Sequence, residues 1–460
     1  MPSKQFVLLK PVQSAKWLTA AVLFLLLHTA PVFSADYYVA TNGVDGNSGT
    51  LDKPFATVQR AQTAAAPGDT VFIRGGTYVM SESQIAAREN GRVYVMDLKK
   101  SGAPGARINY WAYPGEQPVF DLANVKPAGE RVYVFFVRGS WLHFKGLEVV
   151  GTQVTVLGHT QSECFENQGD NNIYEQLSMH DGQAIGLYLI RGANNLILNC
   201  DAYRNWDYTS ENKKGGNVDG FGGHPPKGGT NNIFRGCRAW FNSDDGYDCI
   251  NAGERVTFEN CWAFYNGYTT NFASLGDGNG FKGGGYGAAG GRTPDPIPRH
   301  LIQFDLAVHN KANGFYSNHH VGGSDWFNNT AYKNAVNFNM LSVWDDNRTN
   351  VPGYGHALKN NLGFQGRAEV SDLNQTNSDV SFNYFTLNLL VAAKDFLSLD
   401  ELQLTAPRQP NGDLPVITFL HLAPGSGLID AGRNIGFAFH GIAPDLGAFE
   451  NGFTNSPPTK

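Results

Sequence analysis

The chain has 460 residues, of which 17 % are charged and 54 are glycine. This composition is typical of a turn-rich β protein rather than a helical bundle, and one long domain fits the length because β-rich folds often exceed the usual domain size. The net charge of −6 and the absence of any Lys/Arg block argue against nucleic acid as a partner. An acidic ligand remains compatible with this charge, because a local cation can outweigh a weak overall charge.

The N-terminus has the parts of a secretory signal peptide. Three lysines (Lys4, Lys10 and Lys16) precede the apolar run WLTAAVLFLLL at 17–27, and small residues follow in PVFSA. Cleavage after Ser34 or Ala35 would start the mature chain near Asp36. A membrane anchor is the weaker interpretation, because the run is shorter than the ~20 residues that span a bilayer. We therefore expect residues 1–35 to be removed and the protein to be secreted (extracellular or periplasmic) and soluble.

The first folded segment, PFATVQRAQTAAAPGDTVFIRGGTY, predicts a short amphipathic helix from about 57 to 66, followed by a strand. Such a helix would cover the open end of a stack of strands, where unpaired backbone groups need protection.

Five hexapeptides in the middle of the chain share Ala third, an apolar and usually aromatic residue fourth, and Asn sixth. They are CDAYRN (200–205), CRAWFN (237–242), CWAFYN (261–266), DLAVHN (305–310) and NTAYKN (329–334). The final Asn recurs at intervals of 37, 24, 44 and 24. A period near 24, with Gly and Asn at the turns, predicts a parallel β-helix (an all-β solenoid).

In such a solenoid, equivalent residues of successive coils stack about 4.8 Å apart. The recurring Asn would hydrogen-bond to the Asn of the next coil, and the Ala and aromatic positions would form internal stacks. After residue 380 the pattern fades, which favours a C-terminal cap and a tail along the side. No linker divides residues 36–455, so we expect one β-helix domain there and a short tail at 456–460.

Five cysteines are an odd number, and their spacing matches no zinc or redox pattern. Disulfides can form outside the cytoplasm, but at least one thiol must then stay unpaired within a monomer. We expect the protein to be a monomer.

A second element follows the Asn turns: DGFG (219–222), DGYD (245–248), NGFK (279–282) and NGFY (313–316). Its aromatic third position predicts an internal stack, so the fourth position should point outward by strand alternation. Asp219 would then lie over Asp245, and Asp248 would be a neighbour of Lys282 on the outer face.

Four carboxylates, Asp219, Asp244, Asp245 and Asp248, therefore converge over two coils. Like charges this close destabilise the fold unless a cation or a proton intervenes. An all-oxygen cluster on turns favours a hard cation and suits calcium better than magnesium. We interpret the cluster as a calcium site, although an Asp in a Gly-rich turn and a lone Lys such as Lys282 are more often simply solvated.

The loops beside this cluster are extended. The repeated Asn is followed by the second element after 3 residues in two coils (242–245, 310–313), but after 14 (205–219) and 13 (266–279) in the two others. Long loops beside a rigid scaffold usually form binding walls. His319 and His320 also lie within reach of such a groove, although polar residues that close a turn are the simpler interpretation.

Calcium beside a lysine in an exported β-helix suggests chemistry on an acidic sugar. Removal of the C5 proton of a uronate places charge on its carboxylate, which calcium would stabilise. Lys282, when neutral, would take that proton, and the glycosidic oxygen at C4 would leave by β-elimination. Because a lysine has a reference pKa of about 10.4, this hypothesis predicts higher activity at alkaline pH.

The sequence resembles polysaccharide lyase family 9, which consists mostly of pectate lyases and related uronate-polymer lyases. The resemblance runs from YYVATNGVDGNSGTLDKPFATVQRA to PDLGAFE, and its specific part is GGNVDGFGG, GCRAWFNSDDGYDCIN and NGFKGGG. The family's calcium aspartates match Asp219, Asp244, Asp245 and Asp248, and its lysine base matches Lys282. The resemblance implies a right-handed parallel β-helix, calcium dependence and eliminative cleavage of polygalacturonate. The segment GFGGHPPKGGTNN departs from the family, so the preferred polymer stays open.

Two other functions remain as alternatives. A β-helical glycoside hydrolase of the polygalacturonase type would use Asp219, Asp244 and Asp245 as acid and base, and would give saturated products. A non-catalytic, calcium-stabilised carbohydrate-binding β-helix would bind without cleaving. The lyase is favoured because neither alternative explains why Lys282 aligns with Asp248.

Overall fold

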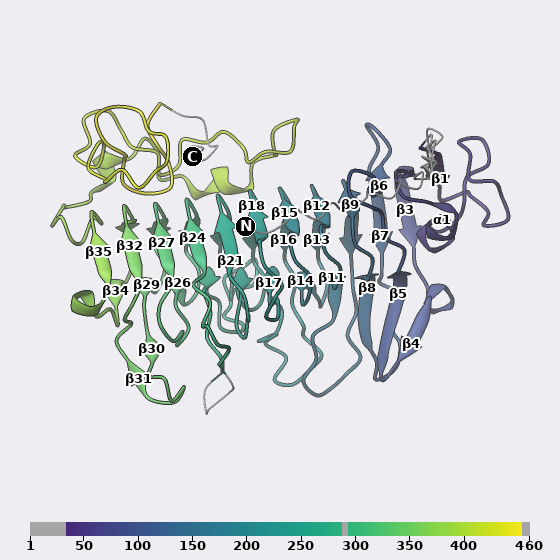
Figure 1. The fold of residues 1–460 in the computed structure, drawn as a ribbon, viewed down its shortest axis with the longest axis horizontal. Helices are drawn as coiled ribbons and strands as arrows, with labels where there is room; N and C mark the ends of the chain where they lie inside the picture. The colour runs from purple at the N-terminus through teal and green to yellow at the C-terminus, as the bar shows by residue number, and fades with distance from the viewer. Residues whose placement is uncertain (1–33, 288–292, 453–460) are drawn as a thin grey trace, which may run out of the picture. The chain divides into compact units, whose positions relative to one another are not determined.

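The computed structural model describes residues 34–287 and 293–452. Within these residues the strands form three long, mostly parallel sheets of 12, 11 and 10 strands, and successive coils add one strand to each sheet in turn (Figure 1). This is the parallel β-helix that the 24-residue spacing predicts. The predicted signal peptide lies almost wholly outside the described residues, and the predicted tail at 456–460 lies wholly outside them.

Each sheet takes one short strand from nearly every coil. The 12-stranded sheet consists of β1 (Asp36–Val39), β2 (Thr70–Ile73), β6 (Ile108–Ala112), β9 (Leu142–Lys145), β12 (Ile173–Glu175), β15 (Leu196–Leu198), β18 (Asn232–Arg235), β21 (Val256–Glu259), β24 (Leu301–Gln303), β27 (Asp325–Phe327), β32 (Ala357–Lys359) and β35 (Asp379–Ser381). The 10-stranded sheet consists of β3 (Gly76–Val79), β7 (Pro118–Asp121), β10 (Glu148–Val150), β13 (Ser178–His180), β16 (Asp201–Tyr203), β19 (Arg238–Trp240), β22 (Trp262–Phe264), β25 (Leu306–Val308), β28 (Thr330–Tyr332) and β33 (Leu362–Phe364).

The 11-stranded sheet consists of β4 (Ala87–Glu89), which is antiparallel to β5 (Arg92–Leu98), then β8 (Arg131–Val137), β11 (Glu163–Asn167), β14 (Ile185–Leu189), β17 (Phe221–Gly223), β20 (Tyr247–Asp248), β23 (Phe281–Lys282), β26 (Asn313–Tyr316), β29 (Val336–Asn339) and β34 (Ala368–Ser371). A small hairpin joins β30 (Ser342–Val343) and β31 (Asn350–Val351). The described helical segments are α1 (Val58–Ala64) and the 3₁₀ turns η1 (Glu82–Gln84), η2 (Gln375–Asn377), η3 (Ala393–Asp395) and η4 (Glu401–Thr405).

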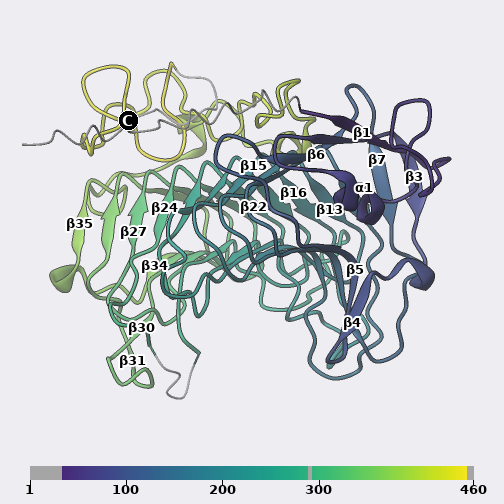
Figure 2. The same ribbon diagram turned by 45° about the vertical axis from the view of Figure 1, so that its right-hand side comes forward.

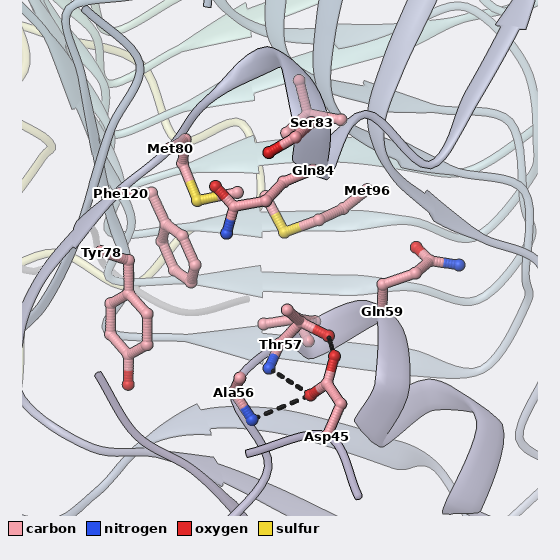
Figure 3. Close-up of a pocket in the computed structure, with 12 residues that line it drawn as sticks. Asp45, Ala56, Thr57, Gln59, Tyr78, Met80, Ser83, Gln84, Met96 and Phe120 are labelled. Carbon is pink, nitrogen blue, oxygen red and sulfur yellow. Dashed lines mark hydrogen bonds between the residues drawn. The ribbon is translucent and has the colours of Figure 1, made fainter. Parts of the chain in front are cut away.

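Helix α1 lies at the N-terminal end of the stack, beside β1 and β3 (Figure 2), and confirms the predicted capping helix. Its N-cap residue Thr57 accepts a hydrogen bond from the backbone N–H of Arg60. Asp45 fixes this end of the helix, because its carboxylate accepts from the N–H groups of Ala56 and Thr57, both at 2.9 Å, and from the Thr57 hydroxyl at 2.8 Å (Figure 3).

A cavity of about 280 Å³ lies next to α1 (Figure 3). Its walls come from α1, η1 and the first coils, and are mostly apolar. They are formed by Asp45, Ala56, Thr57, Val58, Gln59, Tyr78, Met80, Ser83, Gln84, Val95, Met96 and Phe120. The cavity therefore belongs to the cap and shares no residue with the predicted carboxylate cluster.

The recurring asparagines form the predicted ladder. The side-chain amide of Asn205 donates to the side-chain oxygen of Asn242 at 3.2 Å, and the bond repeats from Asn242 to Asn266 (3.2 Å), from Asn266 to Asn310 (3.0 Å) and from Asn310 to Asn334 (3.1 Å). Each of these side chains is at most 2 % exposed. Buried amides that bond to one another satisfy groups that water cannot reach, which fixes the turn in every coil.

The Ala position of the hexapeptides is internal, as predicted, but the aromatic position is not. Ala202 and Ala239 are paired in register and fully buried. Because successive residues of a strand face opposite sides, the following residue of each hexapeptide points out of the coil. The rings of Tyr203 and Trp240 do stack, at 4.1 Å, but on the outer face of the 10-stranded sheet.

The C-terminal segment covers this outer face. In Figures 1 and 2 it runs along the outside of the stack, in yellow-green to yellow. Arg408 from this segment pairs with Asp201 of β16 (2.6 Å), and Asp201 also pairs with Arg238 of β19 (2.8 Å). Arg238 in turn donates to the backbone oxygens of Leu404 (3.1 Å) and Ala406 (2.8 Å). The outward aromatic row is therefore buried by a segment from far along the chain.

Replacement of Asp201 by asparagine is expected to lower the free energy of unfolding by about 3 kcal/mol, because two mostly buried guanidinium groups lose their counter-charge. Burial opposes ionisation of Asp201, but Arg408 and Arg238 outweigh it and lower the pKa of this carboxyl to about 2. An unfolded aspartate has a pKa of about 3.9, so the stabilisation is complete above about pH 4 and is lost as the pH falls toward 2.

Denaturant unfolding at neutral and at acidic pH measures this effect. Asp379→Asn is the matched control, because Asp379 is 62 % exposed and pairs with Lys359 at the surface, where ion pairs contribute little. Equal losses of stability in the two variants would contradict the role given to Asp201.

All five cysteines are free and buried in the structure. Cys200, Cys237 and Cys261 open three successive hexapeptides and belong to the apolar core, so they pack as small hydrophobic side chains. In the described part of the chain, no helix has the length and apolar character needed to cross a bilayer.

Candidate active site

The site is built on a column of aromatic rings inside the 11-stranded sheet. Phe221, Tyr247, Phe281 and Phe315 are fully buried and stack in order, with ring centroids 5.2, 4.6 and 5.1 Å apart. This confirms the predicted internal stack. Because the third position of each element faces inward, the fourth position faces outward, on strands whose register is fixed by the rings.

The register brings the predicted carboxylates of two coils together. The backbone N–H of Asp245 donates to Oδ1 of Asp219 at 3.1 Å. One oxygen each of Asp219, Asp244 and Asp245 lie within 4.8 Å of one another, and the three residues are 3 %, 5 % and 0 % exposed. These three residues form what we call the carboxylate cluster.

Backbone N–H groups hold the carboxylate cluster in place from one side. The N–H of Asp277 donates to Oδ1 of Asp244 at 2.7 Å, and the N–H and side-chain amide of Asn279 donate to Oδ1 of Asp245 at 2.7 and 2.8 Å. Asp277 belongs to the long loop between Asn266 and Asn279, so this insertion contacts the cluster directly. The hydrogen bonds orient Oδ2 of Asp245 toward Lys282.

Lys282 lies beside the carboxylate cluster on β23. It pairs in register with Asp248 of β20, and its Nζ lies 3.0 Å from Oδ2 of Asp248 and 3.1 Å from Oδ2 of Asp245. The other oxygen of Asp248 accepts from the backbone N–H of Ile250 at 2.7 Å. Asp248 thus contacts the lysine and lies next to the cluster, and its predicted role as a fourth ligand remains a prediction.

The charges of the site act strongly on one another. Burial raises the pKa values of Asp219, Asp244 and Asp245, and repulsion from neighbouring carboxylates raises them further. Burial alone would lower the pKa of Lys282, but Asp248, Asp245, Asp219 and Asp244 outweigh it and raise this pKa well above its ordinary value. Lys282 is therefore held as an ammonium, and one such group offsets only part of the negative charge.

The carboxylate cluster fits a hard divalent cation. Its donors are all oxygens, three of them converge within 4.8 Å, and their residues are almost completely buried. Buried carboxylates this close are unfavourable unless a cation or protons compensate. Carboxylate oxygens and the absence of Cys or His from this group match the ligand preference of calcium.

Two tyrosine–histidine pairs lie on the same outer face, and of their four residues only His319 was a candidate from the sequence. On one side of Lys282, Tyr316 is its register partner on β26, and the Tyr316 hydroxyl and Nδ1 of His319 are 3.1 Å apart. Burial raises the pKa of Tyr316 to about 12. On the other side, the rings of Tyr188 and His224 are 4.5 Å apart. The sequence signal for Tyr316 was present, because NGFY places it where NGFK places Lys282.

The two adjacent histidines of the turn after β26 differ. His319 is partly exposed beside Tyr316, whereas His320 is fully buried, where its Nδ1 accepts from the N–H of Gly285 at 3.1 Å and its Nε2 lies 2.8 Å from the backbone oxygen of Pro298. His320 therefore closes the turn, and only His319 lies on the side of the site.

A parallel β-helix that carries a lysine and a buried carboxylate cluster on the outer face of one sheet defines a class of solenoid proteins with an acidic site on that face. The family model described as "Pel9A-like, right handed beta helix region" matches residues 37–379 of this chain. The chain belongs to this family. The match confirms both the resemblance to the pectate lyase-like family 9 and the right-handed fold that it implied.

Named relatives agree with this family. Pectate lyase L of Dickeya chrysanthemi is 34 % identical over 454 residues, which cover 94 % of this chain and 97 % of that protein. A solved structure titled "Rhamnogalacturonan lyase" is 46 % identical, with a TM-score of 0.82 and coverage of 85 % of this chain and 96 % of that one. The structure of pectate lyase Pel9A is 33 % identical, with a TM-score of 0.74 and coverage of 91 % and 97 %.

These relatives align with this chain over nearly their whole length. The protein is therefore a polysaccharide lyase of the pectate lyase-like family. This finding favours the lyase over the hydrolase and over the non-catalytic binding protein among the functions that the sequence left open.

Proposed function

We propose that this protein is a secreted, calcium-dependent lyase that cleaves polygalacturonate or a related uronate polymer by β-elimination. The observation that carries the proposal is the position of Lys282, whose Nζ lies 3.1 and 3.0 Å from Asp245 and Asp248, directly beside the buried carboxylate cluster. A base next to a site for a cation is what proton removal α to a carboxylate requires.

Lys282 is the catalytic base in this proposal. Its Nζ, once neutral, accepts the C5 proton of the uronate, the C4–C5 double bond forms, and the glycosidic oxygen leaves C4. Asp248 and Asp245 hold the lysine side chain in one direction, because each offers an oxygen to Nζ. Positioning of this kind lets a flexible side chain act at a defined atom.

Asp219, Asp244 and Asp245 would hold the calcium ion, with Asp248 as the fourth carboxylate beside it. Calcium bound there supplies positive charge that stabilises the uronate carboxylate as C5 loses its proton, and that offsets the carboxylates which keep Lys282 protonated. The chain's own contribution is to keep these oxygens together in a buried place, with backbone N–H groups of the 266–279 loop on one side.

An acidic polymer is the proposed partner, and the relatives name two candidates. The pectate lyase relatives favour polygalacturonate, whereas the 46 % identity to a rhamnogalacturonan lyase favours a rhamnogalacturonan. Both contain galacturonate, so the same lysine and carboxylates serve either one. The signal peptide predicted from the sequence would bring the enzyme to such polymers outside the cell.

The proposal is tested with the purified mature protein and each polymer in separate reactions, with calcium or with a chelator. Growth of the ultraviolet absorbance of unsaturated uronate, abolished by the chelator, is expected with at least one polymer. The proposal would be overturned by chain shortening without that absorbance. It would also be overturned by cleavage at the same rate with calcium and with the chelator. The polymer with the higher kcat/KM identifies the substrate.

Activity is expected to rise as the pH increases above neutrality. Only neutral Lys282 accepts a proton, and the surrounding carboxylates raise its pKa above the ordinary value, so the neutral fraction grows as the pH approaches that pKa. Initial rates at saturating calcium over a range of pH measure this dependence. A maximum in acid solution would contradict Lys282 as the base.

A further inference from the structure

Tyr316 has no role in the mechanism so far, although it is the residue of the next coil that lies beside Lys282. The two residues are paired in register on β26 and β23, and neighbouring strands are about 4.8 Å apart. Phe315 before it is fully buried in the aromatic column, so Tyr316 must point outward on the same face as the lysine. Its side chain is partly exposed.

The hydroxyl of Tyr316 is held by the turn that follows its strand. It lies 3.1 Å from Nδ1 of His319. His319 is fixed in turn, because its N–H donates to the backbone oxygen of Leu341 at 2.8 Å and the side chain of Asn318 donates to the backbone oxygen of Gly284 at 2.7 Å. The phenol is therefore a positioned group rather than a free surface side chain.

Lys282 and Tyr316 are held by different polar partners. The Nζ of Lys282 is drawn toward Asp245 and Asp248, which belong to the preceding coil, whereas Tyr316 is held by His319 on its own coil. The two side chains are therefore held from different coils, Lys282 from the preceding coil and Tyr316 from its own. In a galacturonate that is linked through axial bonds, the C5–H and C4–O bonds point to opposite faces of the ring. A sugar bound between these two side chains would present its C5–H bond to Lys282 and its C4–O bond to Tyr316.

Elimination also needs a proton donor. When the C4–O bond breaks, the leaving oxygen of the sugar becomes a strongly basic alkoxide unless it receives a proton in the transition state. The carboxylates of the site carry no proton for this purpose once a cation is bound, and Lys282 accepts a proton instead of giving one. The Tyr316 hydroxyl is a neutral donor on the strand that is paired with that of Lys282.

We propose that Tyr316 is the general acid of the reaction and that His319 positions it. This inference rests on the elimination proposed above. Lys282 takes the C5 proton, the C5–H electron pair forms the C4–C5 double bond, the C4–O pair goes to the leaving oxygen, and that oxygen takes the phenolic proton. The Tyr316 phenolate then regains a proton from solvent through His319, and the Lys282 ammonium returns its proton to solvent, so that protons and charges balance.

Tyr316→Phe tests this role, because it removes the hydroxyl and keeps the ring. Turnover of the natural polymer is expected to fall by about 10²-fold or more. A synthetic uronate with a phenoxide leaving group at C4 needs no proton on that oxygen, so the variant is expected to cleave it at close to the wild-type rate. An equal fall with both substrates, or no fall with the polymer, would overturn the assignment.

Hydrogen exchange separates failure of the acid from failure of the base. In heavy water, Tyr316→Phe is expected to incorporate deuterium at C5 of substrate that is recovered uncleaved, because Lys282 still removes the proton. Lys282→Met is expected to show neither exchange nor cleavage. If the wild-type enzyme formed no unsaturated product from any uronate polymer, the proposed function itself would fail, whatever the Tyr316 variant did.

Two further variants complete the test. His319→Ala is expected to slow polymer cleavage and, like Tyr316→Phe, to spare the phenoxide substrate, whereas a merely structural role would slow both. Tyr188→Phe is the comparison for the other tyrosine of this face, which also lies next to a histidine but whose ring packs over Gly222, on the opposite side of Asp248 from Lys282. Loss of activity in Tyr188→Phe with full activity in Tyr316→Phe would contradict the proposal.

Discussion

Lys282→Met is expected to reduce the rate of unsaturated-product formation by about 10³-fold, the largest effect of any single change on this surface. Methionine keeps most of the side-chain length but cannot accept the C5 proton, and a positioned general base contributes about 10²–10⁴ to the rate. The measurement is kcat and kcat/KM with the preferred polymer at saturating calcium and alkaline pH.

Lys359→Met is the matched control for this variant. Lys359 lies on β32 in a different sheet and pairs with Asp379 at the surface, so its loss is expected to leave the rate unchanged. Retention of more than a tenth of wild-type activity by Lys282→Met would show that another group removes the proton.

Asp244→Asn is expected to change protein stability in opposite directions with and without calcium. Without calcium, the substitution removes one of three crowded, buried negative charges, and the Asn side-chain oxygen can still accept from the N–H of Asp277. The variant should therefore be more thermostable than the wild type. With saturating calcium, a ligand is missing, so the variant should be less thermostable than the wild type, which the bound ion stabilises more by mass action.

Thermal unfolding of both proteins over a calcium titration tests this reversal, and activity should fall together with the calcium-dependent stabilisation. Asp379→Asn provides the comparison, since the exposed Asp379 is remote from the carboxylate cluster. If Asp244→Asn destabilised the calcium-free protein and left the effect of calcium intact, the carboxylate cluster would not be the ion site.

The repeat explains why the site could be assembled from sequence. In a solenoid, residues at the same place in successive coils are neighbours, so aligning DGYD with NGFK already placed Asp248 against Lys282, as the register shows. The same alignment placed Asp219 next to Asp245 in the neighbouring coil. No long-range folding information was needed for these contacts, because each coil specifies its own turn through one buried asparagine.

Other features depend on contacts that the repeat does not encode. The outward aromatic row containing Tyr203 and Trp240 looked internal, because hydrophobic residues on both faces of a strand do not reveal which face is the core. Its cover is the C-terminal segment, held through Arg408, more than a hundred residues away in sequence. Similarly, the hydrogen bond from Asp277 to Asp244 depends on the path of a long loop.

The role of Tyr316 could not be predicted from the sequence for a different reason. Its place in the alignment was readable, but a tyrosine in the fourth position had no assigned chemistry until the structure showed His319 at its hydroxyl. That contact depends on two successive residues with positive φ, Asn318 at 52° and His319 at 60°. Such a conformation is uncommon outside glycine, and the sequence of the turn does not specify it.

The most direct test of elimination at Lys282 is the mass of the oligosaccharides released from the preferred polymer in heavy-oxygen water. The account predicts products that carry one unsaturated uronate end, are lighter by one water than hydrolysis products and, when their reducing ends are reduced before they exchange, contain no oxygen from the solvent, with none formed by Lys282→Met. Saturated products that carry solvent oxygen would contradict it, because water would then have cleaved the glycosidic bond.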